Sequence, residues 1–192
     1  MRKGILSLAI ALIAFGYSYG QELKLGGGIS FSDVSKVSDG EATGKLGAQL
    51  GGSLVFGHQF YFEPGVYYTT KSTEFINSSD ISGSNYKTDA LIKGIRVPVI
   101  IGMNVLGDTE SLVNLRVFGG GSGFFVTGTG KDIPKSEVEK TNWGLLAGTG
   151  VDVWIFFADL SYEWSLTDIS NSGADIGKYR SLFGNVGIRL KF

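Results

Sequence analysis

The chain of 192 residues carries 17 Lys and Arg against 18 Asp and Glu, and this near balance excludes the basic surface of a nucleic-acid-binding protein. It contains no cysteine, so it has neither disulfide bonds nor the cysteine that anchors a bacterial lipoprotein. Its 30 glycines, 13 phenylalanines and only 3 prolines favour many strands and turns over helices.

The start of the chain is expected to be a secretory signal peptide. Arg2 and Lys3 supply a positive beginning, and residues 5–15 form an apolar stretch that is too short to span a bilayer as a helix. Small residues then suit a cleavage site. The alternative is an N-terminal membrane anchor. We therefore expect a signal peptide over residues 1–20 and one domain over residues 21–192.

Apolar and polar residues alternate from Glu22 onward, which is typical of strands because successive side chains point to opposite faces. In the first half of the domain this pattern predicts strands over residues 22–31, 44–56, 60–70 and 89–105. Pro64 and Pro98 lie inside the third and fourth of these strands and cannot donate a backbone hydrogen bond. We expect a bulge or a local break in pairing at Pro64, and a bulge at Pro98.

The second half of the domain predicts four further strands, over residues 111–127, 142–154, 156–166 and 179–192. The last of them, YRSLFGNVGIRLKF, has one apolar face and one mostly polar face with two cations. A free sheet edge invites aggregation, so this final strand needs a partner. The first strand is the natural neighbour, and pairing the two would close a barrel.

The connections between these strands alternate in length. Four long polar stretches cover residues 32–43, 71–86, 128–140 and 167–178, whereas the other three connections are short turns. An up-and-down barrel with an even number of strands places all short turns at one rim, together with both termini, and all long loops at the other. Outer-membrane barrels have this asymmetry, with periplasmic turns and extracellular loops.

Two kinds of barrel fit eight alternating strands: a membrane barrel with a polar lumen, and a soluble lipocalin-like barrel with an apolar interior. Aromatic residues near both ends of the apolar faces favour the membrane barrel, because lipid interfaces select such girdles. They are Phe56, Phe60, Phe156 and Phe192 at the short-turn rim, and Phe31, Tyr68, Phe125 and Trp164 near the long-loop rim.

The opposite, polar faces carry charges of both signs and many glycines, which leave room for bulky neighbours in a confined lumen. The expected lumen charges are Lys24, Lys45, Glu63, Arg96, Arg116, Asp152, Asp159, Glu163, Arg189 and Lys191. The interior of an eight-stranded barrel is just wide enough to be filled by side chains. We interpret these charges as a packed network of ion pairs, and the alternative is a narrow or gated conduit.

The alternation, the segment IRVPVIIG (residues 95–102) and the ending GIRLKF (residues 187–192) resemble the PorT-like "porin family" β-barrels of Bacteroidetes. The resemblance implies an eight-stranded antiparallel barrel in the cell outer membrane, with outer-membrane lipid and lipopolysaccharide around it. It also implies that the outer-membrane assembly machinery reads Ile188, Leu190 and Phe192 as a terminal signal. Members of the group share architecture more than activity, so the resemblance supplies no ligand.

Catalytic chemistry finds little support in the sequence. Asp152, Asp159 and Glu163 are the carboxylates that could act as acid and base, but the lumen arginines are simpler partners for them. His58 lies in a short turn at the periplasmic rim. The segment GTGKD, residues 128–132, lacks the spacing of a phosphate-binding loop. We expect no catalytic, cofactor-binding or metal-binding residues, and no cofactor.

We therefore predict an integral outer-membrane barrel without enzymatic activity, in which four long extracellular loops serve structural or surface-interaction roles. The partner of the loops is not specified by the sequence. One alternative is a small gated porin or transport channel. A second alternative is a secreted, soluble, lipocalin-like barrel that binds an apolar ligand.

Overall fold

The computed structural model describes residues 21–34, 42–44, 46–77, 86–107, 111–129, 141–167 and 179–191. The expected signal peptide, Lys45 and Phe192 lie outside these residues, so the predictions made for them stay predictions. Among the residues described, no helix is long and apolar enough to cross a membrane.

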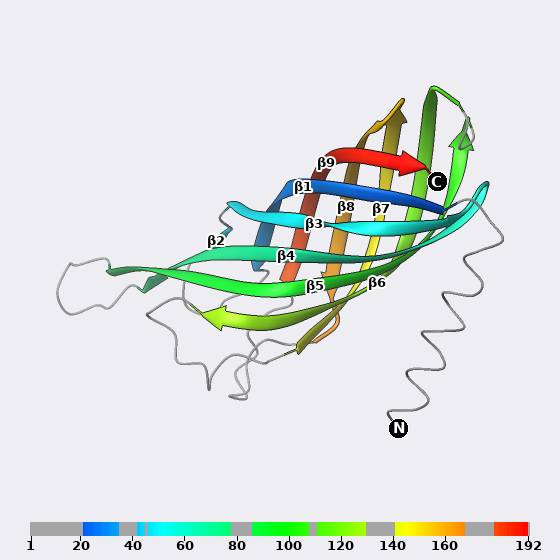
Figure 1. The fold of residues 1–192 in the computed structure, drawn as a ribbon. Coiled ribbons are helices and arrows are strands. Elements are labelled where there is room, and N and C mark those ends of the chain that lie inside the picture. The colour runs from blue at the N-terminus through cyan, green and yellow to red at the C-terminus, as the bar shows by residue number, and fades with distance from the viewer. Residues whose placement is uncertain are drawn as a thin grey trace.

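Strands make up nearly all of the described chain (Figure 1). They are β1 (Gln21–Val34), β2 (Ala42–Gly44), β3 (Leu46–Gly57), β4 (Phe60–Asn77), β5 (Tyr86–Leu106), β6 (Val113–Thr129), β7 (Thr141–Val153), β8 (Phe156–Ser165) and β9 (Tyr179–Lys191). Apart from the three-residue β2, these are the eight strands that the alternation predicts, with bounds that differ by a few residues.

The strands form one antiparallel sheet in the order β2-β4-β3-β1-β9-β8-β7-β6-β5, and the pairing of β4 with β5 closes it. The eight long strands therefore make an up-and-down barrel, which confirms the predicted fold class. Closure leaves none of these eight without a neighbour on either side, and so removes the free edges that would template aggregation.

The first and last strands pair along their whole described length, from Glu22 opposite Lys191 to Val34 opposite Tyr179. The start of β1 also lies opposite Phe56, next to the short β3–β4 turn. Both ends of the barrel-forming chain therefore lie at the short-turn rim, as predicted. At this rim β7 and β8 are joined by two residues, and Trp154 takes a φ of 57° there, an unusual conformation for a bulky residue.

The second expected loop is shorter than predicted because β4 and β5 continue into it. Their pairing extends to Asn77 opposite Tyr86, and β2 pairs with β4 at Thr73–Phe75. In Figure 1 this hairpin projects beyond the other strands. Ladder hydrogen bonds join backbones whatever the side chains, so a Ser-rich and Asn-rich stretch that reads as a loop still forms strand.

Each proline lies at a local break in one of its two ladders, without a shift of register: Pro64 on the β3 side and Pro98 on the β4 side. Around Pro64 the pairing of β4 with β3 is interrupted between Gly65 and Phe62, with no change of register, which confirms the predicted local break. Pro98 pairs with Ser122 in regular register, so the bulge predicted there is wrong. The register shifts of β5 lie elsewhere, between Lys93 and Gly94 and between Asn104 and Leu106.

Side chains sort cleanly between the two faces of the wall. Outward positions carry large exposed apolar residues, for example Leu50 at 70% and Val186 at 64% exposure, whereas Lys24 and Arg116 face inward at 1% and 2%. Exposed aromatic rings occur at both rims, including Phe60 at the short-turn rim. A soluble barrel has the opposite polarity, so the lipocalin-like alternative is wrong for this fold.

Candidate functional site in the lumen

Four inward-facing charges meet at the centre of the barrel, and we call them the central quartet. Lys24 comes from β1, Glu63 from β4, Arg116 from β6 and Asp159 from β8. In the order of the closed sheet these are every second long strand, so the four side chains converge from four sides of the lumen. Their signs alternate around the ring.

Each neighbouring pair of the central quartet is in contact. Lys24 Nζ lies 3.1 Å from Glu63 Oε1 and 2.6 Å from Asp159 Oδ2. Arg116 closes the ring, with Nη2 at 2.6 Å from Asp159 Oδ1 and Nη1 at 3.8 Å from Glu63 Oε2. All four side chains are at most 11% exposed, so each charge has its main partners inside the ring instead of in water.

Neighbouring polar groups and rings complete the environment of the quartet. The Ser53 hydroxyl donates to Glu63 Oε1 over 2.6 Å, and Arg116 Nη1 donates to the Tyr61 hydroxyl over 3.4 Å. The ammonium of Lys24 sits 4.4 Å from the centre of the Phe157 ring. These contacts satisfy part of the hydrogen-bonding capacity that burial removes from solvent.

A second cluster closes the lumen on the side of the short turns. Arg189 binds both Glu22 and Asp152, and Asp152 also accepts a 2.8 Å hydrogen bond from Arg116, which joins this cluster to the quartet. Asn114 donates to Asp152 and to the side chain of Asn104. In turn, Asn104 donates to the backbone carbonyl of His58 in the short β3–β4 turn.

A third group lies toward the long-loop rim. Arg96 donates through Nε and Nη2 to Glu163 Oε2 over 2.9 and 2.6 Å, and Ser122 donates to the same oxygen over 2.7 Å. The guanidinium of Arg96 lies 4.1 Å from the centre of the Phe183 ring, which is completely buried. Beyond this pair, Ser32 is hydrogen-bonded to Ser181 over 2.9 Å.

Bulky inward rings pack directly over inward glycines of neighbouring strands. A Cβ atom added to Gly102 would lie 2.3 Å from the Tyr61 ring, and one added to Gly148 would lie 2.6 Å from the Phe118 ring. The Phe157 ring covers two glycines, Gly26 on β1 and Gly187 on β9, and so lies across the seam between the first and last strands. The glycines provide the space in which these rings fill the barrel.

Most of the charges expected in the lumen meet in these three groups. Lys24, Glu63, Arg96, Arg116, Asp152, Asp159, Glu163 and Arg189 are all buried there or nearly so. Among the expected charges that the structure describes, the exception is Lys191, which is exposed because it lies at the end of β9, level with the rim. Its expected place in the lumen network is therefore wrong.

The lumen also holds polar residues that the predicted charge network left out. Glu22, Asn104 and Asn114 are each at most 3% exposed and take part in the cluster at the short-turn end. Glu22 precedes Lys24 by two positions and therefore shares its face. The same alternation could have found it, but a residue at the very start of a strand reads as part of the rim.

The chemistry of this arrangement is mutual neutralisation. Three carboxylates, Asp152, Asp159 and Glu163, each bind an arginine. The described residues contain no cluster of His, Asp, Glu or Cys that could hold a metal ion. The charged side chains of the described lumen therefore serve as partners for one another.

Comparison with known proteins places this geometry in a family. Residues 18–171 match the family described as outer membrane protein beta-barrel domain. The match ends before β9, the strand that completes the barrel. No curated protein sequence matches the chain.

Two solved structures of bacterial proteins are similar to this chain. Neisserial surface protein A matches with a TM-score of 0.51 and 17% identity, over 90% of this chain and 97% of that chain. The attachment invasion locus protein Ail of Yersinia pestis, solved with the heparin analogue sucrose octasulfate, matches with a TM-score of 0.47 and 17% identity, over 90% and 99% of the two chains. At this level of identity the likeness concerns the fold alone.

Proposed function

Since the chain belongs to the outer membrane protein beta-barrel domain family and is an integral barrel of the outer membrane, we propose that it is a closed, non-conducting anchor without enzymatic activity. Its task is to hold the four connections of the long-loop rim at the cell surface, in structural or surface-interaction roles. The central quartet is the observation that carries the proposal, because charges from alternate strands meet across the lumen.

A closed lumen follows from the size of the barrel and from its contents. Eight strands enclose an interior that side chains can fill, whereas porins that leave an aqueous channel have about 16–18 strands. The quartet occupies the middle of this barrel, the Arg189 cluster lies at the short-turn end, and the Arg96–Glu163 pair lies toward the other rim. Of these three groups, only the quartet joins charges from four sides of the lumen, so an ion crossing the barrel would have to separate its buried pairs.

The proposed absence of catalysis is supported by the hydrogen bonds that the lumen carboxylates accept from neighbouring side chains. A general acid or base must reach a substrate and exchange its proton. Asp152 and Asp159 both receive hydrogen bonds from Arg116, and Glu163 receives two from Arg96 and one from Ser122. These hydrogen bonds occupy the carboxylate oxygens with partners from the barrel itself.

A narrower family membership is also proposed. The segments IRVPVIIG and GIRLKF support placement among the PorT-like barrels of Bacteroidetes. Within such a barrel the long-loop rim would face the cell exterior, which gives the four long connections access to partners.

Conductance in planar bilayers tests the closed lumen. The purified wild-type barrel is expected to be silent, whereas a variant with Ser at all four quartet positions is expected to pass ions, because it exchanges four long charged side chains for short ones. Arg116→Ser alone serves as a milder variant. Heat-modifiable mobility on SDS gels shows that each barrel is folded before it is measured.

Steady conductance of the folded wild-type barrel would overturn the closed-anchor proposal and support the small gated porin. Silence of the wild type together with conductance of the four-Ser variant would show that the quartet itself blocks the lumen. A folded four-Ser variant that is also silent would mean that the quartet is not what closes the barrel.

A further inference from the structure

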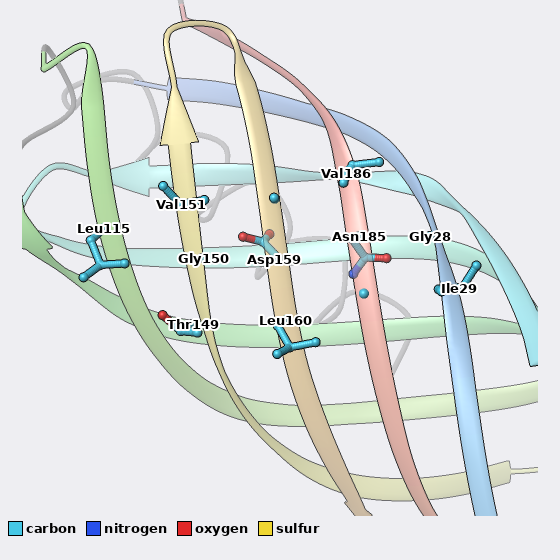
Figure 2. Close-up of a pocket in the computed structure, with 12 residues that line it drawn as sticks. Gly28, Ile29, Leu115, Thr149, Gly150, Val151, Asp159, Leu160, Asn185 and Val186 are labelled. Atoms are coloured by element: carbon cyan, nitrogen blue, oxygen red, sulfur yellow. The ribbon is translucent and has the colours of Figure 1, made fainter.

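A hollow of about 630 Å³ lies on the barrel wall, and its lining places it on the outer surface (Figure 2). It extends over five adjacent strands, from β6 through β7, β8 and β9 to β1. Eight of its twelve lining residues sit at outward positions of these strands, among them Leu115, Leu160 and Val186. Its volume lies within the range of about 300–1,000 Å³ that is usual for ligand pockets.

Small outward residues form the floor of the hollow. Two rows of Cα partners cross the wall side by side, one through Leu115, Val151, Ala158 and Val186, the other through Thr149, Leu160, Gly184 and Ile29. Thr149, Ala158 and Gly184 are the small members, on three successive strands. A Cβ atom added to Gly184 would meet only Ile29 within 4 Å, at 4.0 Å, so the space above this glycine is open.

The medium around this wall decides what occupies the hollow. Its side walls are continuous with the apolar outward face of an integral outer-membrane barrel, so the adjoining molecules are lipid acyl chains. Toward the long-loop rim, β9 continues from Gly184 through outward Leu182 to Arg180, which is exposed. Arg180 lies four positions before Gly184 along the strand, a rise of about 13 Å.

We propose that this hollow, the outer-wall groove, seats one acyl chain of an outer-leaflet glycolipid whose phosphate pairs with Arg180. The groove matches the chain in polarity, and Arg180 matches the headgroup in charge at the rim where that headgroup lies. Across the sheet Arg180 lies opposite Trp164 on β8, a residue type that lipid interfaces favour, and opposite Asp33 on β1, with which a phosphate would share it. The other four lining residues, Asp159 of the quartet among them, sit at lumen-facing positions, and the proposed contacts use only the outward residues. The proposal is therefore independent of whether the barrel conducts.

Native mass spectrometry of the detergent-purified barrel, titrated with lipid A, tests the groove. One bound lipid A per wild-type barrel is expected. Gly184→Leu fills the floor and is expected to weaken binding about tenfold, as when two methylene groups lose their burial. Gly121→Leu is the matched control, because Gly121 also faces outward, outside the groove, with its nearest neighbour 3.6 Å from an added Cβ. This control is expected to bind like the wild type.

The phosphate contact has its own pair of variants. Arg180→Gln is expected to weaken the binding of lipid A but not of dephosphorylated lipid A, while Lys93→Gln, an exposed cation on β5, leaves both unchanged. Equal binding by Gly184→Leu and the wild type would overturn the groove, and equal binding by Arg180→Gln would overturn the phosphate contact. If the wild type were a dimer that Gly184→Leu dissociates, the occupant of the groove would be a second copy of the chain and not a lipid, which would also overturn the proposal.

Discussion

Among the described lumen residues, Arg116 contacts the largest number of other polar side chains. Its Nη2 lies 2.8 Å from Asp152 and 2.6 Å from Asp159, while its Nη1 faces Glu63 and donates to the hydroxyl of Tyr61. The flat, forked guanidinium can reach partners in several directions at fixed angles, which a lysine ammonium does not reproduce. Arg116 therefore links the quartet to the Arg189 cluster at the short-turn end of the lumen.

Replacing Arg116 with Leu should destabilise the barrel by roughly 3–5 kcal/mol, because removing one partner leaves buried carboxylates without compensation. Urea-induced unfolding from lipid vesicles measures the effect. Arg116→Lys keeps the charge and should cost less than Arg116→Leu. An Arg116→Leu barrel as stable as the wild type would show that the quartet contributes no net stability.

Val186 tests the opposite face of the wall. It is outward and 64% exposed, so Val186→Arg should cost about 2–4 kcal/mol if it lies near the bilayer midplane. Refolding into vesicles of defined lipid measures the loss, with Val186→Leu as the control. Normal assembly of Val186→Arg would contradict the assignment of this face to lipid.

At the scale of elements, packing of rings on glycines joins neighbouring strands. The ring of Tyr61 on β4 lies over Gly102 on β5, so Gly102→Ala would push against it. The expected cost is about 1–3 kcal/mol, which is typical of overpacking. Gly121→Ala, on the outward face, should be nearly neutral by comparison.

The substitution Tyr61→Leu tests whether the cost of Gly102→Ala comes from packing against the Tyr61 ring. Truncation of the ring in a Tyr61→Leu barrel leaves space for the added methyl group, so Gly102→Ala should cost less in that background. Unfolding free energies of the four barrels form a double-mutant cycle. A cost of Gly102→Ala that is the same in both backgrounds would contradict the ring contact.

The final strand carries an assembly prediction. We propose that Ile188, Leu190 and Phe192 are read by the outer-membrane assembly machinery, which the alternation of the last strand supports. A double substitution of Ile188 and Leu190 by Ser should reduce the amount of barrel in the outer membrane, measured by fractionation and immunoblotting. Leu23 and Leu25, outward residues on β1, provide the matched double substitution, which should have a smaller effect.

Alternation predicted the strands and their faces because it depends only on neighbours in sequence. It placed Lys24 and Asp159 inward, where the structure has them, but it did not give their contact. Which inward residues meet depends on the stagger with which eight strands close, and no single strand encodes that stagger. The polar hairpin ends of β4 and β5 escaped detection for a related reason, since backbone pairing carries no composition signal.

On the scale of the whole molecule, closure depends on the seam between β1 and β9. Arg189 on β9 binds Glu22 on β1 across this seam, and Phe157 packs over a glycine from each strand. Arg189→Leu should lower the temperature at which the barrel loses its compact mobility on SDS gels. Lys191→Leu changes an exposed residue two positions away and should leave that temperature unchanged. Equal shifts for both variants would contradict a stabilising role of the Arg189–Glu22 ion pair at the seam.

The alternating signs of the quartet have a consequence for how the finished ring is recognised. Lys24 belongs to the first strand, and its three companions lie on β4, β6 and β8, so the ring stays incomplete until the two ends of the sheet meet. A slip of two residues in β1 would bring Glu22 to the place of Lys24, setting three acids beside one arginine. A slip the other way would bring Gly26, with no charge at all. Of these three alignments of β1, only the native one balances the charges at the centre of the barrel, so the quartet favours closure in the correct register.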